Sequence, residues 1–195
     1  MDKRSERSAA TRRELVDVAV RLFGERGYDG TSIEAVLAET GMSRGSLYHH
    51  FAGKQALFEA ALDAVEQRIG SETAAAAVGA SDAVDGLRRG CLAWVRLAGD
   101  PAVRRVVLID APSVLGWQRW REIEEENALG LIKLVVQQAA DEGRVPPELV
   151  DVFAHVVLAT VNEVALLVAR AGGDGAAAQR TAEQAVDELL RRLFG

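Results

Sequence analysis

The sequence has few of the residues that cross-link, interrupt or stiffen a protein fold. Among 195 residues, cysteine occurs once and proline four times, and aromatic residues make up 5%. The single cysteine, Cys91, excludes a disulfide within the chain and indicates a reducing, cytoplasmic location. No segment alternates polar and apolar residues like a strand, and no Asn-Gly or Asp-Gly turn joins two such segments. These absences argue against a disulfide-rich fold and against a sheet.

Several motifs of common enzyme classes are also absent. There is no Gly-rich phosphate loop, no His-Glu-x-x-His and no Cys-x-x-Cys. An acidic run at Glu122, Glu124, Glu125 and Glu126 is expected to be a solvated face, because no histidine lies at metal-ligand spacing. We therefore expect no enzyme activity, no cofactor and no metal site.

Neither a secretion signal nor a membrane segment is expected. The first residues are polar and charged, unlike a secretory signal. The most apolar region, 149–171, is interrupted by Asp151, His155, Asn162 and Glu163. These side chains make it a poor membrane span and suit it better to a buried or interface helix.

What the sequence does have is helical periodicity. Apolar residues, mainly Ala, Val and Leu, recur at three- and four-residue spacing, which predicts an all-α protein of about nine helices. The expected helices cover approximately residues 9–26, 31–40, 44–50, 54–77, 83–98, 101–109, 117–142, 147–171 and 176–194. Between them we expect a loose arm at 1–8, a connector at 110–116 where Pro112 interrupts the helix, and a Gly-rich loop at 172–175.

The pattern of residues 31–54 is typical of a helix-turn-helix. Thr31 and Glu34 fit a capping box at the start of the first short helix. Gly41 is expected to end that helix in a left-handed conformation, and Ser43 to cap the next one. Two short helices joined by a Gly-containing turn form the characteristic DNA-binding motif of this kind.

The second of these helices is too short and too polar to be a core element. Its apolar side is thin and consists of Leu47 and Phe51. Its other side carries Arg44, Gly45, Ser46, Tyr48, His49 and His50. A guanidinium group, hydroxyls and imidazoles suit base edges and phosphate oxygens, and a glycine allows close approach of the backbone to DNA.

The same segment resembles a known family. The run GMSRGSLYHHF at 41–51 is followed by Gly53-Lys54 and preceded by a helix that ends in Phe23-x-x-x-Gly27-Tyr28. This combination is similar to the DNA-binding domain of the tetracycline-repressor (TetR) family of bacterial regulators, over roughly residues 11–62. The resemblance implies a helix-turn-helix domain at 1–53, a connecting helix at 54–78, and a helical-bundle domain for ligand binding and dimerisation at 79–195.

The resemblance also implies roles for individual residues. Arg44 matches the best base reader, because its guanidinium can form a bidentate pair with guanine. Gly45 and Tyr48 match positions that contact base edges or the sugar-phosphate backbone. The positions that match phosphate contacts are Thr31, His49, His50 and Lys54, and further DNA-binding candidates are Ser32, Ser43 and Ser46.

The charge distribution agrees with a DNA-binding amino-terminal domain and a separate carboxy-terminal domain. The net charge is −6, but residues 1–54 carry 9 Lys/Arg against 8 Asp/Glu, whereas the remainder carries 14 against 21. The acidic surplus therefore lies outside the segment that is expected to meet DNA.

The carboxy-terminal half is expected to supply the dimer and the effector site. The last two helices, at about 147–171 and 176–194, are apolar enough to pair with a second copy, although core packing would also explain them. Candidate ligand contacts are aromatic or polar side chains on apolar faces, each of which would also be usual in a core. They are Trp94, Trp117, Trp120, His155 and Asn162.

Together, the residues and the resemblance imply a homodimeric cytoplasmic repressor. It would bind a pseudo-palindromic double-stranded DNA operator and be released by an unknown small-molecule effector, without contact to a membrane. The alternative is a DNA-binding architectural or constitutive factor that has no effector.

Overall fold

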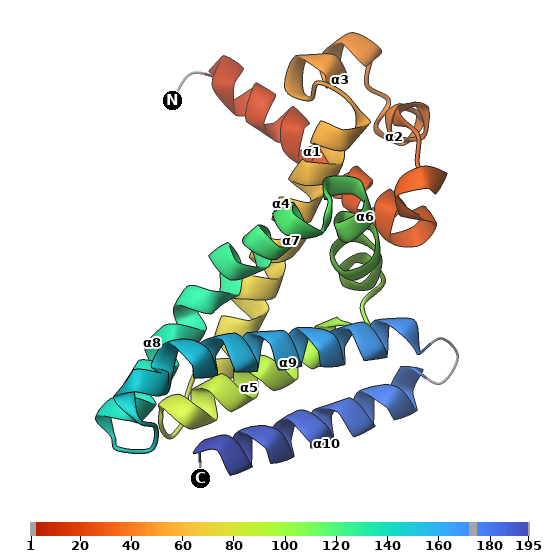
Figure 1. Ribbon diagram of the computed structural model, residues 1–195. Helices are drawn as coiled ribbons and strands as arrows, with labels where there is room; N and C mark the ends of the chain where they lie inside the picture. The colour runs from red at the N-terminus through yellow and green to blue at the C-terminus, as the bar shows by residue number, and fades with distance from the viewer. Residues whose placement is uncertain (1–2, 172–174, 195) are drawn as a thin grey trace. The chain divides into compact units, whose positions relative to one another are not determined.

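The computed structural model of the chain, which describes residues 3–171 and 175–194, contains helices and no strand in those ranges (Figure 1). Contiguous segments join into nine helical stretches among the described residues, which confirms the predicted fold class. The elements are α1 (Lys3–Gly30), α2 (Ile33–Thr40), α3 (Arg44–His50), α4 (Lys54–Ala77), α5 (Ala83–Leu97), η1 (Val103–Asp110), α6 (Ala111–Leu115), α7 (Trp117–Glu124), η2 (Glu125–Leu129), α8 (Gly130–Asp141), η3 (Pro147–Leu149), α9 (Val150–Arg170) and α10 (Gly175–Phe194). Most of the predicted loop at 172–175 lies outside the described residues.

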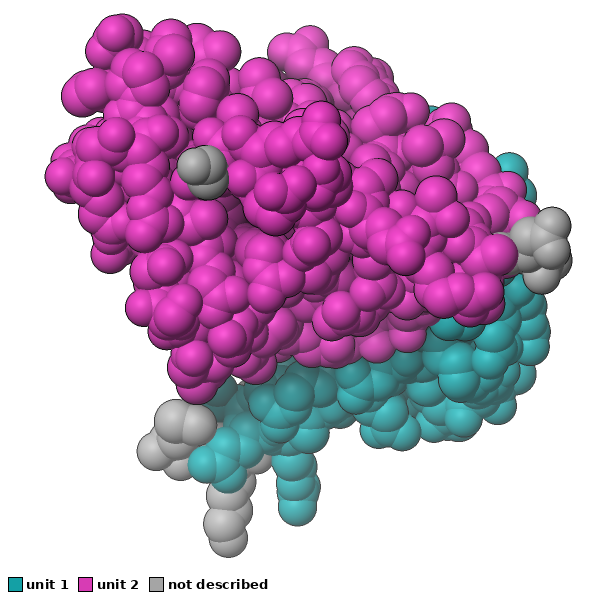
Figure 2. All heavy atoms as spheres, turned by 90° about the horizontal axis from the view of Figure 1, so that it is seen from below, with its two compact units in different colours: residues 1–67, 101–116 teal, residues 68–100, 117–195 magenta. Residues whose placement is uncertain are grey.

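The helices gather into two compact units, which Figure 2 distinguishes by colour. Unit 1 comprises residues 1–67 and 101–116, and unit 2 comprises residues 68–100 and 117–195. Unit 1 is therefore discontinuous in sequence. These units are defined by packing, and the functional division at 53 and 78 that the sequence suggests remains a prediction.

The core of unit 1 is built on the apolar stripe of α1. Leu15, Ala19, Leu22 and Phe23 are fully buried, at the spacing that the sequence predicted for one helix face. The Phe23 ring meets the ring of Phe58, from α4, edge to face with centroids 5.1 Å apart. Such aromatic pairs add to the hydrophobic burial that fixes α1 against α4.

Helix α1 is longer than its apolar stripe. Residues 3–8 are helical, so the expected loose arm is wrong over that range, and Met1 and Asp2 lie outside the described residues. The helix is interrupted at Gly27, whose φ of 74° and ψ of 175° are not helical. The following residues turn again into a short helical segment, so that Gly27 marks a kink where the sequence predicted an end.

Helix η1 packs against α1 and continues without a break into α6. The expected connector at 110–116 is therefore wrong for residues 110–115. Pro112, which has no amide hydrogen, stands directly after the last π-type hydrogen bond, from the Ala111 amide to the Val106 carbonyl, where the pattern changes to an α-helix.

Asp110, at the end of η1, fastens this segment to the kink in α1. Its buried carboxylate accepts a hydrogen bond from the Tyr28 amide at 2.6 Å, across 82 residues of sequence. It also accepts a hydrogen bond from Nε of Arg105 at 3.3 Å. The Arg105 guanidinium in turn lies against the backbone of Gly27. One carboxylate thus organises the kink from a distant part of the chain.

Replacing Gly27 with alanine is expected to destabilise unit 1 by about 1–3 kcal/mol, because only glycine adopts this backbone conformation without strain. A Cβ at this position would also collide with the Arg105 guanidinium. Urea unfolding followed by circular dichroism measures the effect. Gly53→Ala is the matched control, since a Cβ there meets open space and the backbone has no positive φ; equal losses in the two variants would contradict the expectation.

Unit 2 is a helical bundle in which α5, α8, α9 and α10 pack on one another, with α9 and α10 running side by side (Figure 1). The segment Pro147–Arg170 has a mean hydropathy of 2.0 in its most apolar window, which is long and apolar enough to cross a membrane by composition alone. Half of that window is buried within the protein. This burial is what a core helix of a bundle requires, and it is consistent with the expected buried or interface helix.

Candidate nucleic-acid interface

The start of α2 differs from the predicted capping box. Ser32 is the N-cap, and its hydroxyl accepts a hydrogen bond from the Ala35 amide at 3.1 Å. Thr31 is instead buried, and its hydroxyl donates to the carbonyls of Leu22 at 3.1 Å and Gly27 at 2.9 Å. The kink at Gly27 leaves these carbonyls near Thr31, and a buried carbonyl requires a donor. The box with Glu34 is therefore wrong, and the Thr31 hydroxyl is occupied inside the unit.

The turn between α2 and α3 forms as predicted. Gly41 is left-handed, with φ 66° and ψ 12°, and its amide donates to the Leu37 carbonyl at 2.9 Å. Ser43 then caps α3, because its hydroxyl accepts a hydrogen bond from the Ser46 amide at 3.2 Å. Leu47 and Phe51 are buried and anchor the helix to the core. This anchoring fixes which side of α3 faces outward.

The outward side of α3 carries most of the predicted DNA-binding residues. Its side chains and backbone are exposed at Ser43, Arg44, Gly45, Tyr48 and His49, whereas Ser46 and His50 are half-buried. Ser32 is exposed at the start of α2. The structure thus brings together every predicted DNA-binding residue of α3 on one short, polar helix that is held from behind by apolar side chains.

Arg44 already has a partner on the neighbouring helix. Its side chain is 63% exposed, and its guanidinium is hydrogen-bonded to the Glu34 carboxylate. The sequence analysis assigned Glu34 to the capping box and missed this pair, although residues of α2 and α3 that flank a tight turn are natural neighbours. When no other acceptor is present, the Glu34 carboxylate orients the Arg44 guanidinium. The same carboxylate would compete with a DNA base for the hydrogen bonds of that guanidinium.

Two further cations lie over aromatic rings next to α3. Lys54, at the start of α4, places Nζ 4.2 Å from the centroid of the Tyr28 ring. Arg12, which the sequence analysis did not select, lies 5.3 Å from the centroid of the Phe51 ring. Cation–π contacts of this kind hold a positive charge in place without neutralising it. The two contacts therefore hold positive charge close to the residues that follow α3 in the chain.

The surroundings of His50 favour its neutral form. Its pKa lies below the ordinary histidine value, first because of partial burial and then because of the neighbouring His49 and Arg12 charges. A neutral imidazole at neutral pH still donates one N–H to a phosphate oxygen. Proximity to an anionic backbone would raise the pKa again, so binding that involves His50 would be accompanied by proton uptake.

The predicted ligand-contact residues of unit 2 fall into separate places. Trp94 and Asn162 are both buried, and the Trp94 indole donates to Oδ1 of Asn162 at 3.1 Å. The Asn162 amide donates in turn to Glu124 at 2.7 Å. Glu124 is buried, so the expectation that the whole acidic run is solvated is wrong at this position. Its carboxylate is tolerated because it accepts a hydrogen bond inside the bundle.

The other two tryptophans form a pair with unequal exposure. Trp117 is 62% exposed, Trp120 is fully buried, and their ring centroids are 4.7 Å apart. Within the described part of the chain, the indole nitrogen of Trp120 is buried without a hydrogen-bond partner. Trp117 is the only one of the three tryptophans whose ring is open to solvent among the described residues.

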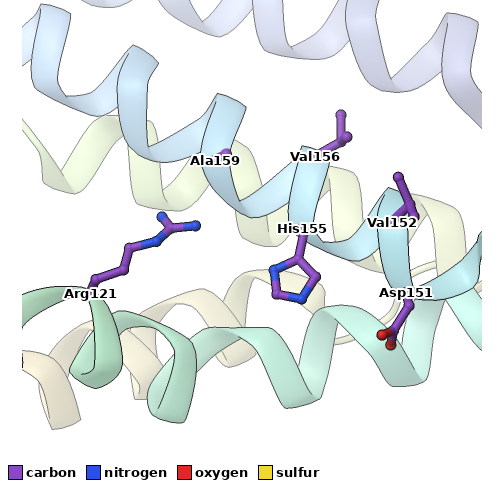
Figure 3. Close-up of a pocket in the computed structure, with 6 residues that line it drawn as sticks. All are labelled: Arg121, Asp151, Val152, His155, Val156 and Ala159. Atoms are coloured by element: carbon purple, nitrogen blue, oxygen red, sulfur yellow. The ribbon is translucent and has the colours of Figure 1, made fainter. Parts of the chain in front are cut away.

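His155 lies in a hollow between α7 and α9, with a volume of about 360 Å³ (Figure 3). The lining residues are Arg121, Asp151, Val152, His155, Val156 and Ala159. The structure does not bring His155 together with Asn162, which belongs to the buried hydrogen-bond chain. Sequence analysis did not place Arg121 and His155 at one hollow, because the two residues come from different helices.

The chemistry of the remaining reactive groups is limited. Cys91 is buried in α5, and burial raises the pKa of its thiol to about 12, so that it is a neutral thiol at physiological pH. In the described ranges, no group of three His, Cys, Asp or Glu side chains is arranged to hold a metal ion. The functional interest of the described surface therefore lies in α3 and in the hollow of unit 2.

Two family models match the chain. A model described as "Bacterial regulatory proteins, tetR family" matches residues 15–61, which include α2 and α3. A model described as "Tetracyclin repressor-like, C-terminal domain" matches residues 84–193, which is more than half of the chain. The first match ends within α4 and the second begins in α5, so that together they cover both the helix-turn-helix and the bundle.

Similar curated proteins match over the amino-terminal part. An HTH-type transcriptional repressor of Mycobacterium tuberculosis is 39% identical over 85 residues, which is 44% of this chain and 42% of that protein. The regulator AcrR of Shigella flexneri is 35% identical over 68 residues, which is 35% of this chain and 32% of AcrR. The chain thus matches less than half of the length of these relatives.

Solved structures match over nearly the whole chain. A TetR-family transcriptional regulator from Pectobacterium atrosepticum is 29% identical, with a TM-score of 0.83 over 99% of this chain and 98% of that one. A TetR regulator from Chloroflexus aurantiacus is 24% identical, with a TM-score of 0.77 over 96% and 97%, and agrees in fold.

Proposed function

The chain belongs to the TetR family of bacterial transcriptional regulators, and on this premise we propose that it is a homodimeric repressor released from a pseudo-palindromic operator by a small-molecule effector. DNA-binding regulation is the activity of the family. Repression, the dimer, the symmetry of the operator and the effector are the proposal. It would act in the cytoplasm, where the chromosome lies.

The observation that carries the proposal is the outward face of α3. This helix has only seven residues, yet Ser43 caps it, and Leu47 and Phe51 anchor it from behind. Such an arrangement presents Arg44, Gly45 and Tyr48 as one rigid edge that fits a major groove. Arg44 is the proposed base reader, and His49, His50 and Lys54 are proposed to contact phosphates. Thr31 is left out because its hydroxyl is occupied.

The exposed face of α9 supports a dimer. Leu167 lies in the second half of this helix, outside the lining of the hollow, and is 59% exposed. Ala185 is exposed on α10, which packs beside α9. Exposed apolar side chains on neighbouring helices often belong to a contact surface. We propose that a second copy covers them in a two-fold symmetric contact, which would supply two reading helices for the two halves of an operator.

The bundle of unit 2 is the proposed effector domain. A ligand that binds the DNA-free form more tightly than the DNA-bound form lowers the affinity of the protein for the operator. The operator lowers the affinity of the protein for the ligand by the same factor. Couplings of about 1–3 kcal/mol are usual for such linked sites. The candidate contacts are the hollow with His155 and the neighbourhood of Trp117, Trp120 and the Trp94–Asn162 pair.

Selection of bound fragments from random DNA by the purified protein, at moderate salt, tests the proposal directly. We expect recovery of a two-fold symmetric motif. Recovery of no motif, with binding that disappears as salt rises, would instead indicate a non-specific architectural factor. The position of the recovered motif relative to promoters then distinguishes repression from activation.

Substitution of Leu167 with glutamate tests the dimer, because a carboxylate placed in an apolar contact has to be desolvated. We expect the variant to sediment as a monomer and to lose at least about tenfold in affinity for the symmetric site, since one half-site alone remains. Leu134→Glu is the matched control, because Leu134 is also exposed but lies on α8. A dimeric Leu167→Glu variant would contradict the assignment of this face.

A further inference from the structure

We propose that the hollow between α7 and α9 is a binding site for an organic monocarboxylate with a small apolar body, and that this acid is the effector. The inference deepens the proposed function, and its second part depends on it. Two side chains that can donate hydrogen bonds, Arg121 and His155, approach the hollow from different helices, beside an apolar wall (Figure 3).

Arg121 provides a guanidinium that is available to a ligand. Its closest carboxylate is that of Glu125, one helical turn away, where Nε and Oε1 are 3.4 Å apart. That distance is longer than a charge-assisted hydrogen bond, which is about 2.7–2.9 Å. Among the described residues the guanidinium donates no hydrogen bond, and Figure 3 shows it extending from α7 toward α9. A planar fork in this state matches the geometry of a carboxylate.

His155 faces the same space from α9. In the described ranges its imidazole makes no hydrogen bond or ion pair, so at least one ring nitrogen is free to donate. Arg121 and His155 can therefore contact one anion from two directions. Two donors on separate elements define a direction for the bound group, which a single surface cation does not.

The one acidic residue of the lining is already neutralised. Oδ1 of Asp151 lies 2.7 Å from Nζ of Lys133, and this hydrogen bond is the main reason that the pKa of Asp151 is lowered. In Figure 3 its carboxylate points away from Arg121. The preference for an anion therefore comes from the hydrogen-bond donors of Arg121 and His155, and not from an excess of positive charge in the lining.

The rest of the lining is apolar and determines the body of the ligand. Val152 and Val156 are about half exposed and Ala159 is exposed, so a ligand would cover apolar surface that water now contacts. The volume of about 360 Å³ is at the lower end of ligand pockets and suits a small molecule. Inorganic phosphate would leave the valine wall uncovered, whereas an acid with an alkyl chain or a single ring would use both parts.

Calorimetric titration of the full-length protein without DNA tests the site, with octanoate, octanol and octylammonium as probes. We expect octanoate to bind and the other two to bind at least tenfold more weakly. Arg121→Gln should weaken octanoate binding by about tenfold or more, because a charge-assisted pair is replaced by a neutral one. Arg119→Gln is the matched control, since Arg119 lies on the same helix but pairs with Glu122 at 3.2 Å and does not line the hollow.

Several outcomes would overturn the proposal. Equal binding of octanol would mean that no carboxylate is recognised, and unchanged octanoate binding by Arg121→Gln would move the site elsewhere. If Arg121→Gln and His155→Gln alter sedimentation but not titration, the hollow belongs to a contact between copies. Because the titration contains no DNA, it decides the site even if no operator is found. Binding of octanoate without any loss of operator affinity would support the site and overturn its role as the effector site.

Discussion

Replacement of Arg44 with alanine is expected to weaken binding to the cognate operator by about 1–3 kcal/mol for each half-site, roughly 5- to 150-fold. The loss should be largest for the selected sequence and should relax the preference at one symmetric base pair. Arg44 occupies the first turn of a capped helix, so its guanidinium starts from a fixed position rather than from a mobile loop. Competition measured by fluorescence anisotropy with single-base operator variants identifies the base pair.

The Glu34 partner makes a second expectation possible. Because Glu34 binds the Arg44 guanidinium in the free protein, a base must displace it. Glu34→Gln should therefore leave the sequence preference intact and increase affinity modestly, by weakening a competitor and removing a charge that repels phosphate.

Two controls separate base reading from general electrostatics. Arg21→Ala removes the same charge from α1, where Arg21 pairs with Glu25 and Glu39, and should change affinity only slightly. Lys54→Ala should weaken binding to all sequences alike and reduce the salt slope by about one. If Arg44→Ala behaved like Lys54→Ala, with an equal loss for every sequence, Arg44 would not be the base reader.

Replacement of Asp110 with alanine is expected to destabilise unit 1 by about 1–3 kcal/mol, since the Tyr28 amide would lose its buried acceptor. Arg105 would also lose its partner, but its partly exposed guanidinium can be hydrated instead. The loss of this ion pair should therefore contribute little to the change in stability. The Tyr28 amide should also exchange its hydrogen faster with solvent, which hydrogen exchange followed by mass spectrometry measures.

A graded series sharpens this prediction. Asp110→Asn retains a carbonyl oxygen that can accept from the Tyr28 amide, and it should lose clearly less stability than Asp110→Ala. Asp187→Ala is the control, because that carboxylate pairs with Arg88 at 2.7 Å on the surface and such pairs contribute about 0–1 kcal/mol. Equal losses for Asp110→Asn and Asp110→Ala would mean that the charge, rather than the hydrogen bond to Tyr28, is what matters.

Sequence reasoning succeeded where the determinants are local. Gly41 and Ser43 define the turn between α2 and α3 through contacts within four residues, and both were predicted correctly. The apolar stripe of α1 follows directly from its spacing. These features depend on which residue stands three or four places away, and that information is present in the sequence.

It failed where a side chain had two competing partners. Thr31 could have capped α2, but the kink at Gly27 exposes carbonyls that take its hydroxyl instead. Glu124 could have been solvated like its acidic neighbours, but Asn162, 38 residues further on, brings a donor to it inside the bundle. Neither partner can be identified without knowing which helices meet.

The discontinuity of unit 1 has a consequence for the order of events during synthesis. The chain leaves this unit at Gln67 and returns to it only at Pro101. At roughly 5–20 residues per second, a ribosome needs several seconds to make the missing part. During that interval the kink at Gly27 has neither Asp110 nor Arg105, and the surface of α1 that later receives η1 is uncovered. The amino-terminal part of unit 1 therefore cannot complete its packing until residues 101–116 have been synthesised. During this interval its uncovered surface is accessible to chaperones and proteases.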